Sequence, residues 1–393
     1  MGSSGTRKYR QKPDFLTIFI VAVLILFGLV CLLSVFASKF DGTEVELARF
    51  WERMDFTYFS LQLGNVLISL LIAIPLILID YRAYKPFVKS VFFGLCIVLG
   101  ILLIVGEYTR GILGWFQVGS RAFQPSEIAK VALVCVLSKF CSEAADKTGG
   151  LRRFWDVLIA LAYFAIPFAL VLAQPDFGTA MVLLVIFLSV TLSAGISWRY
   201  IAIGAAAALV IAPLVYLFLL DNTQKERILV FLDPTRDPSG AGYNVARAKE
   251  LISSGGFLGK GFFAPGTVAQ TGYVPERHTD FIFSGIGEAT GMLGSILLIL
   301  AFFILLFRWL YIAARAQDRF GRCLVVGCTA MIAVHVFENI GMNLGLMPVT
   351  GIPLPFISYG GSNMLASLLA AAIVLSVQIH SIRKTPQRLP GGA

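Results

Sequence analysis

Ten apolar runs of about helix length constrain this chain more than any other feature. A bilayer core needs about 20 predominantly apolar residues in a helix to cross it, and backbone hydrogen bonds in lipid are satisfied only in helices or closed barrels. The runs cover residues 15–37, 58–79, 87–106, 126–141, 156–173, 177–194, 200–220, 281–307, 323–345 and 357–379. Hydrophobic residues make up 57% of the 393 residues and charged residues 14%, far from a soluble composition. The sequence predicts an all-α integral membrane protein with ten transmembrane helices in one polytopic domain, residues 1–393.

Lysine and arginine placement predicts the orientation, because short basic loops stay in the cytoplasm. With a cytoplasmic amino terminus, the inner short segments hold nineteen basic residues and the outer short loops hold five. Both tails, residues 1–14 and 381–393, are therefore predicted to be cytoplasmic. The net charge of +9 then reflects topology and contact with anionic membrane lipids, and it gives no support to nucleic-acid binding.

A polar, glycine-rich stretch, residues 221–280, separates the seventh and eighth runs, and the orientation makes it a large extracytoplasmic loop. Residues 243–253 have the pattern of a short amphipathic helix. The stretch ends at Asp280, directly before the apolar residues 281–283. An acid where water meets lipid, at the mouth of a helix bundle, has the location expected of a catalytic base or binding site.

All six cysteines fall within predicted helices, and the sequence has no CxxC pair and no His/Cys cluster with metal-ligand spacing. We therefore expect no disulfide and no structural metal.

Six motifs in order resemble the signatures of the SEDS family (shape, elongation, division and sporulation proteins). They are Ser120 to Lys130 (SRAFQPSEIAK), Gln174 to Thr179 (QPDFGT), Phe231 to Pro234 (FLDP), His278 to Phe283 (HTDFIF), Asn339 to Met342 (NIGM) and Gly351 to Ser362 (GIPLPFISYGGS). Together they span nearly the whole chain. The segments Gly351 to Pro355 and Asp237 to Tyr243 resemble the elongation branch of the family more than the division branch.

The resemblance implies a peptidoglycan glycosyltransferase that polymerises lipid II on the outer face of the bacterial cytoplasmic membrane during elongation. It also implies a class B penicillin-binding protein as partner, and it leaves a divalent cation, Mg²⁺ or Mn²⁺, open as a cofactor. The alternative is a transporter (flippase) of lipid II, which ten helices with intramembrane charges would also serve. A transporter is expected to have repeated halves, and the sequence shows no internal repeat.

Asp280 matches the family acid that deprotonates the acceptor hydroxyl, and a positioned base is what makes a hydroxyl a good nucleophile. The alternative is an N-cap role for the helix expected to begin at Phe281. Ser284 and Glu288 follow at i+4 and i+8, so a polar stripe on one helix is expected. Glu288 is predicted either to bind substrate or to fix helix packing as a buried carboxyl.

Glu127 and Lys130 are three residues apart within one run, where an unpaired charge is costly, so a structural ion pair is expected. Contact between Lys130 and a substrate phosphate is the alternative. Arg121 is expected to bind the diphosphate or to anchor lipid headgroups. Asp176 is expected to cap the next helix or to belong to the site.

Three more residues complete the predicted substrate-binding set: Lys249, His278 and Ser358. His335, Glu338, Asn339 and Asn343 are expected to form a polar line that faces the bundle interior. Prolines at 348, 353 and 355 rule out a regular helix there, so this segment is expected to form the wall of a cavity.

Overall fold

The structure is a computed structural model of the 393-residue chain. It describes residues 12–36, 56–109, 112–118, 121–218, 240–264 and 276–381, together with residues 225, 229–231, 233, 236 and 237. Most of the predicted tails, 1–14 and 381–393, and much of the 221–280 stretch lie outside the described residues.

Each of the ten apolar runs overlaps one observed helix over most of its length. These helices are α1 (Phe15–Phe36), α3 (Thr57–Leu78), α4 (Val88–Val105), α5 (Pro125–Thr148), α6 (Phe154–Ala173), α7 (Phe177–Ser193), α8 (Trp198–Phe218), α12 (Ile282–Ala314), α13 (Arg319–Asn343) and α14 (Gly361–His380). Seven of the described helices are long and apolar enough to cross a membrane: α1, α3, α4, α6, α12, α13 and α14. For α5, α7 and α8 a crossing stays a prediction, because α5 carries several charges and the apolar parts of α7 and α8 are shorter.

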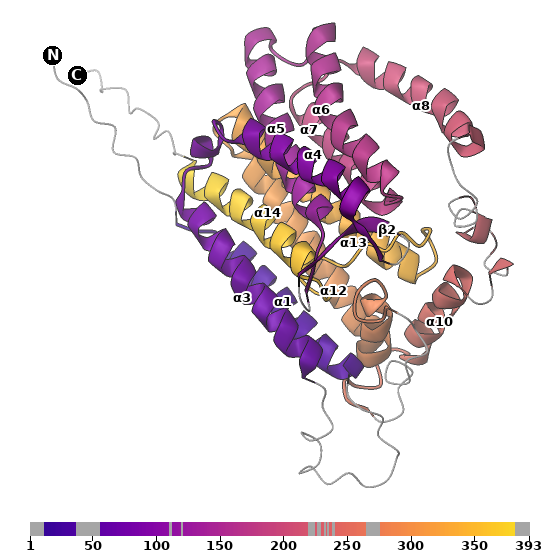
Figure 1. Ribbon diagram of the computed structural model, residues 1–393. Coiled ribbons are helices and arrows are strands. Elements are labelled where there is room, and N and C mark those ends of the chain that lie inside the picture. The colour runs from indigo at the N-terminus through magenta and orange to yellow at the C-terminus, as the bar shows by residue number, and fades with distance from the viewer. Residues whose placement is uncertain are drawn as a thin grey trace, which may run out of the picture.

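Helices α13 and α14 lie inside the bundle and most of their residues are buried. Helix α3 packs along α14, α5 and α7 pack on α13, and α8 lies at the periphery (Figure 1). The outer helices turn large apolar side chains outward: Leu71 of α3 is 74% exposed and Ile104 of α4 is 85% exposed. An apolar surface of this kind is unfavourable in water and is expected to contact the lipid chains of a membrane.

A small antiparallel sheet corrects the all-α prediction. Strands β1 (Glu107–Thr109), β2 (Ile112–Val118) and β3 (Arg121–Phe123) form it in that order, between α4 and α5. Phe116 of β2 pairs with Phe123 of β3. The β-branched and aromatic residues of β2 favour a strand. This segment is too short to count among the apolar runs of helix length.

One described helix of the predicted loop is α10 (Ala241–Ser254), which confirms the predicted amphipathic helix. Beyond it, the backbone of residues 255–261 lies against a break in α12 at Gly291, where φ is +66°. Lys260 N donates to Glu288 O at 2.9 Å and Met292 N donates to Gly256 O at 2.9 Å. A Cβ at Gly291 would lie 2.4 Å from Gly259 N, so only glycine permits this approach.

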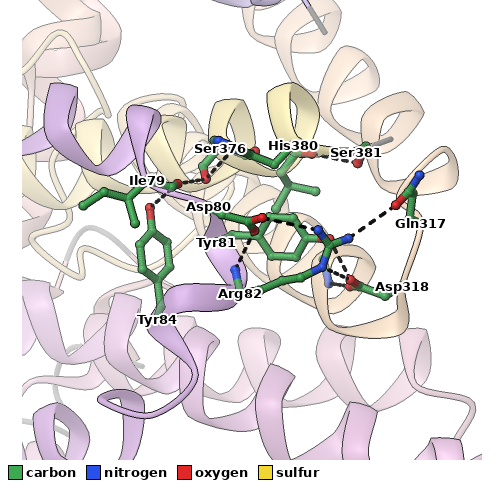
Figure 2. A network of polar contacts seen from close by, with 12 residues as sticks. Ile79, Asp80, Tyr81, Arg82, Tyr84, Gln317, Asp318, Ser376, His380 and Ser381 are labelled. Atoms are coloured by element: carbon green, nitrogen blue, oxygen red, sulfur yellow. Dashed lines mark hydrogen bonds and ion pairs between the residues drawn. The ribbon is translucent and has the colours of Figure 1, made fainter. Parts of the chain in front are cut away.

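A polar network ties the turn between α3 and α4 to the turn between α12 and α13 (Figure 2). The turn between α3 and α4 contains the 3-10 helix η2 (Tyr81–Tyr84). Arg82 Nε lies 2.8 Å from Asp318 Oδ2, and Tyr81 OH donates to the same oxygen at 2.7 Å. Asp318 Oδ1 also accepts from Gly321 N at 2.7 Å and thereby caps α13. The network lies at the opposite end of α3 from Thr57.

The Asp318 network makes a pH-dependent contribution to stability. Partial burial alone would raise the pKa of the Asp318 carboxyl, but hydrogen bonds from Gly321, Tyr81 and Arg82 outweigh burial and lower the pKa. A carboxyl with a lowered folded-state pKa stabilises the protein above its unfolded pKa of about 3.9. That contribution is lost as the pH falls through the folded-state pKa.

We expect Asp318→Asn to lower the free energy of unfolding at pH 7 by about 1 kcal/mol, a value discounted for solvent screening. The variant should also lose less of its unfolding free energy than the wild type as the pH falls below 4. Thermal unfolding in detergent across pH 3 to 7 measures both, and identical pH curves for wild type and variant would contradict the prediction.

Candidate active site

Asp280 ends a short turn, residues 276–280, that precedes α12. The helix begins at Ile282 with Phe281 in the N-cap position, and the first-turn N–H of Ser284 donates to Asn343 Oδ1 at 3.1 Å. The expectation that Asp280 caps this helix is therefore wrong. The expected stripe is also wrong, because Asp280 precedes the helix that carries Ser284 and Glu288.

The backbone around Asp280 is held from two sides. Asn339 Nδ2 and Asn343 Nδ2 of α13 both donate to Asp280 O, at 2.9 and 3.0 Å. Ser358 Oγ donates to Thr279 O at 2.6 Å. Because neighbouring carbonyls are held by buried partners, the Asp280 side chain projects from a fixed backbone.

These bonds also explain the polar line on α13. His335, Glu338, Asn339 and Asn343 are all at most 2% exposed, which confirms that the line faces the interior. Asn339 Nδ2 donates in addition to Ile352 O at 2.8 Å. The non-helical segment between α13 and α14, residues 344–360, is thus tied to the same helix as Asp280, and the prolines end regular helix there as predicted.

Asp280 lines a first cavity of about 450 Å³. Its lining combines the amino-terminal ends of α3 and α14 with strand β2 and the turn that carries His278. Three rings gather at its edge: the centroid of Tyr58 lies 5.0 Å from that of His278 and 5.2 Å from that of Tyr359. Burial lowers the pKa of the adjacent Arg277 guanidinium, and Tyr58 opposes this effect; the group stays cationic, since arginine does not deprotonate in proteins.

A second cavity of about 340 Å³ adjoins the first and is also lined by Asp280. Four carboxylates line it, those of Glu127, Asp176, Glu276 and Asp280, and no lysine or arginine is among its described lining residues. Asp280 and Trp115 line both cavities. The proposed base therefore lies where the two cavities meet.

Glu127 and Lys130 form the ion pair that the sequence predicts. Lys130 Nζ lies 2.7 Å from Glu127 Oε1 and 2.8 Å from His335 Nε2, and Lys130 is fully buried. Glu127 Oε2 is also buried, without a hydrogen-bond partner among the described residues. Glu127 lines the second cavity, whereas Lys130 lines neither cavity.

Asp176 caps α7, as one of its two predicted alternatives states, and it also lines the second cavity. Its Oδ1 accepts from Thr179 N at 2.9 Å and so caps α7. Its Oδ2 accepts from Gln124 Nε2 at 3.2 Å, and the residue lines the second cavity.

Besides Lys130, three more residues of the predicted substrate-binding set line neither cavity: Lys249, Glu288 and Ser358. Glu288 is 1% exposed and its Oε1 lies 2.8 Å from Lys260 Nζ, which fits the packing alternative. Lys249 packs against Gly345. Ser358 contributes to the site by its hydrogen bond to Thr279 O, next to Asp280. Arg121 lies in β3 beside cavity-lining Ala122, and its side chain lies outside the described part of the chain.

Sequence reasoning missed several cavity residues: Tyr58, Asn65, Gln124 and Asn363. Gln124 lies inside a motif and Asn363 directly follows one, so their position in the sequence could have indicated that they belong to the site. Tyr58 and Asn65 lie on a helix that carries none of the motifs, and only the packing of α3 along α14 brings them to the site.

A bound cation was left open by the sequence. Within the described residues no group of three or more His, Cys, Asp or Glu side chains could hold a metal ion. No step below is routed through a bound cation.

Comparison with known proteins decides the family. Residues 14–383 match the family model for FtsW, RodA and SpoVE, described as "Cell cycle protein". The chain belongs to the SEDS family. Among SEDS relatives, the peptidoglycan glycosyltransferase MrdB of Escherichia coli K12 is 37% identical over 325 residues, 81% of this chain and 85% of MrdB. Stage V sporulation protein E of Bacillus subtilis is 32% identical over 379 residues, 95% of this chain and 98% of that protein.

Solved SEDS-like structures agree with the fold. The crystal structure of the rod shape determining protein RodA of Thermus thermophilus matches with a TM-score of 0.66 and 25% identity, and the match covers 94% of this chain and 98% of RodA. A chain from a structure described as a peptidoglycan synthase complex that coordinates polymerization and crosslinking matches with a TM-score of 0.76 and 29% identity, over 94% of this chain and 97% of that one. These matches support the RodA-like assignment within the family.

Proposed function

We propose that this SEDS protein polymerises lipid II into glycan strands, with Asp280 as the general base. Glycosyltransferase activity is supported by the names of its curated relatives. The observation that carries the mechanism is the position of Asp280 at the junction of two cavities. A polymerase must hold two lipid-linked sugars at once, and a base between them can reach the hydroxyl of one beside the anomeric carbon of the other.

The proposed reaction is a single displacement. Asp280 takes the proton of the acceptor hydroxyl while that oxygen forms a bond to the donor anomeric carbon. The bond from that carbon to the diphosphate oxygen breaks, and its electron pair leaves with the lipid diphosphate. Because the leaving group is already a diphosphate, one carboxylate suffices where glycosidases use two. The anomeric carbon is inverted.

The proposal extends to partner and location. A class B penicillin-binding protein as partner is supported by the match to a chain of the peptidoglycan synthase complex. The RodA match supports a role in elongation and cell shape. By the charge count, the Asp280 end of the bundle faces the outside of the cytoplasmic membrane and both termini face the cytoplasm.

The test is to purify the chain with and without a class B penicillin-binding protein and to supply lipid II. Glycan ladders from the wild type are expected. Folded protein that binds lipid II yet makes no ladder with its partner would overturn the proposed function.

One observation favours the alternative, a lipid II transporter: α12 is broken at Gly291, and broken helices are common in transporters. The break lies against residues 255–261 of the chain itself, however, and Gly291 lines neither cavity. Movement of lipid II across proteoliposomes without polymer would favour transport.

Asn343 is expected to position Asp280 without touching substrate. Asn343→Ala removes its hydrogen bonds to Asp280 O, Asn339 O and Ser284 N. We expect kcat to fall about tenfold, since a misplaced base transfers protons poorly, while the KM for lipid II stays within about twofold. Steady-state ladder synthesis at varied lipid II measures this, and a raised KM with unchanged kcat would contradict a positioning role.

A further inference from the structure

The two cavities beside Asp280 differ in charge. Four carboxylates line the second cavity, and its α7 terminus is already capped by Asp176. An anion placed there would meet like charges at short range, which is destabilising in a partly buried site. In the first cavity Asp280 is the one carboxylate among the described lining residues.

The amino-terminal turn of α14 lines the first cavity instead. Gly360, Gly361 and Ser362 line the cavity. Gly360 is the N-cap residue with φ +153°, a conformation that L-residues rarely adopt, so the side chains that usually cap helices are excluded here. Gln62 Oε1 accepts from the N-cap N–H of Gly360 at 3.1 Å, whereas no side chain of the described residues accepts from the N–H groups of Gly361, Ser362 or Asn363. The first N–H groups of a helix have no partner within the helix, and together with the helix dipole they favour an anion.

A second observation points to the same ligand. Asn363, in the first turn of α14, is 3% exposed and lines the first cavity. Neither its Nδ2 nor its Oδ1 has a hydrogen-bond partner among the described residues. Buried amides are nearly always satisfied, so an unpartnered one on a cavity wall marks a place where a ligand completes the bonding.

We propose that the amino terminus of α14 and the Asn363 amide bind the diphosphate of the donor lipid. This assignment rests on the proposed function and deepens it. The diphosphate accepts hydrogen bonds from the first-turn N–H groups and from Asn363 Nδ2. These donors therefore stabilise the negative charge that builds on the departing oxygen as the bond to the anomeric carbon breaks.

Other groups around the first cavity agree with this placement. Helix α3 also begins there, at Thr57, and the Arg277 guanidinium lies near Tyr58. His278 lines the same wall. The acid-lined second cavity is then left for the acceptor sugar, whose hydroxyl and amide protons suit carboxylate acceptors. Asp280, at the junction, faces the hydroxyl that it deprotonates.

The test measures binding in detergent with three probes: farnesyl diphosphate, farnesol and inorganic pyrophosphate. Asn363→Asp places a negative charge among the proposed donors with little change in shape. The matched control is Gln378→Glu, the same amide-to-acid change at the far end of α14, where Gln378 Nε2 donates to Lys12 O.

Asn363→Asp is expected to weaken farnesyl diphosphate binding about 10-fold to 100-fold, the range for losing a hydrogen bond to a charged group. Farnesol binding should stay unchanged, and Gln378→Glu should bind all probes as wild type does. If Asn363→Asp does not fold, Asn363→Ala, which loses the same hydrogen bond without adding a charge, should weaken farnesyl diphosphate binding about tenfold. Loss of pyrophosphate binding in the same variants would support the site with the phosphates alone as its ligand. Farnesyl diphosphate affinity within twofold of wild type in a folded Asn363 variant would overturn the inference.

A parallel ladder assay separates this inference from the proposed function. Weakened diphosphate binding in Asn363→Asp supports the site even if the wild type makes no polymer. Ladders from Asn363→Asp at the wild-type rate, with unchanged diphosphate affinity, would remove the site and leave the polymerase proposal standing.

Discussion

Asp280→Asn should make no detectable glycan strands while still binding lipid II. The amide keeps the size of the side chain and cannot accept the acceptor proton, and loss of a general base typically costs 10²-fold to 10⁴-fold in rate. Because Asp280 O, rather than its side chain, receives the Asn339 and Asn343 bonds, the backbone of the turn should stay in place. Ladder synthesis from labelled lipid II, read beside a lipid II binding curve, measures both quantities.

Asp146→Asn is the matched control for that experiment. Asp146 is 64% exposed and pairs with Arg319 at 3.0 Å, away from both cavities. An exposed ion pair contributes little to stability, so this variant should polymerise at the wild-type rate. Equal rates from Asp280→Asn and Asp146→Asn would remove Asp280 from the mechanism.

Lys130→Met should destabilise the fold strongly. Lys130 is fully buried, and its removal leaves the Glu127 carboxylate, 3% exposed, without its cation. Breaking a buried ion pair from one side typically costs about 3–5 kcal/mol. We expect a large fall in the thermal unfolding temperature in detergent, which differential scanning fluorimetry measures.

The double variant Glu127→Gln/Lys130→Met decides what Lys130 does. If the pair is structural, removing both charges should restore most of the lost stability, because no unpaired charge stays buried. If Lys130 instead binds a substrate phosphate, the double variant should be stable yet bind farnesyl diphosphate more weakly. Since Lys130 lines neither cavity, we expect recovered stability with unchanged affinity.

The apolar runs predicted the helices well, because a segment that crosses lipid must be apolar and must satisfy its backbone hydrogen bonds internally. The Glu127–Lys130 pair and the Asp176 cap were also predictable, since both depend on residues three apart in one helix turn. The sheet formed by β1, β2 and β3 was not, because its strands are short and lie between the apolar runs.

The failures at the site share one physical cause. Helical spacing placed Asp280, Ser284 and Glu288 on one stripe, but α12 begins only at Ile282. Glu288 was left open between substrate and packing, and its partner Lys260 comes from a loop that no local pattern connects to it. Tyr58 likewise reaches the first cavity only through packing between α3 and α14. Contacts between distant segments depend on the assembled bundle, which local spacing does not encode.

The most direct test of the account is a structure of Asp280→Asn with lipid II bound. The account predicts a sugar hydroxyl within hydrogen-bond distance, about 2.6–3.2 Å, of the residue 280 side chain, with the sugars at the junction of the two cavities. Lipid II sugars bound instead at the opposite end of the bundle, beside Arg82 and Asp318, would contradict it.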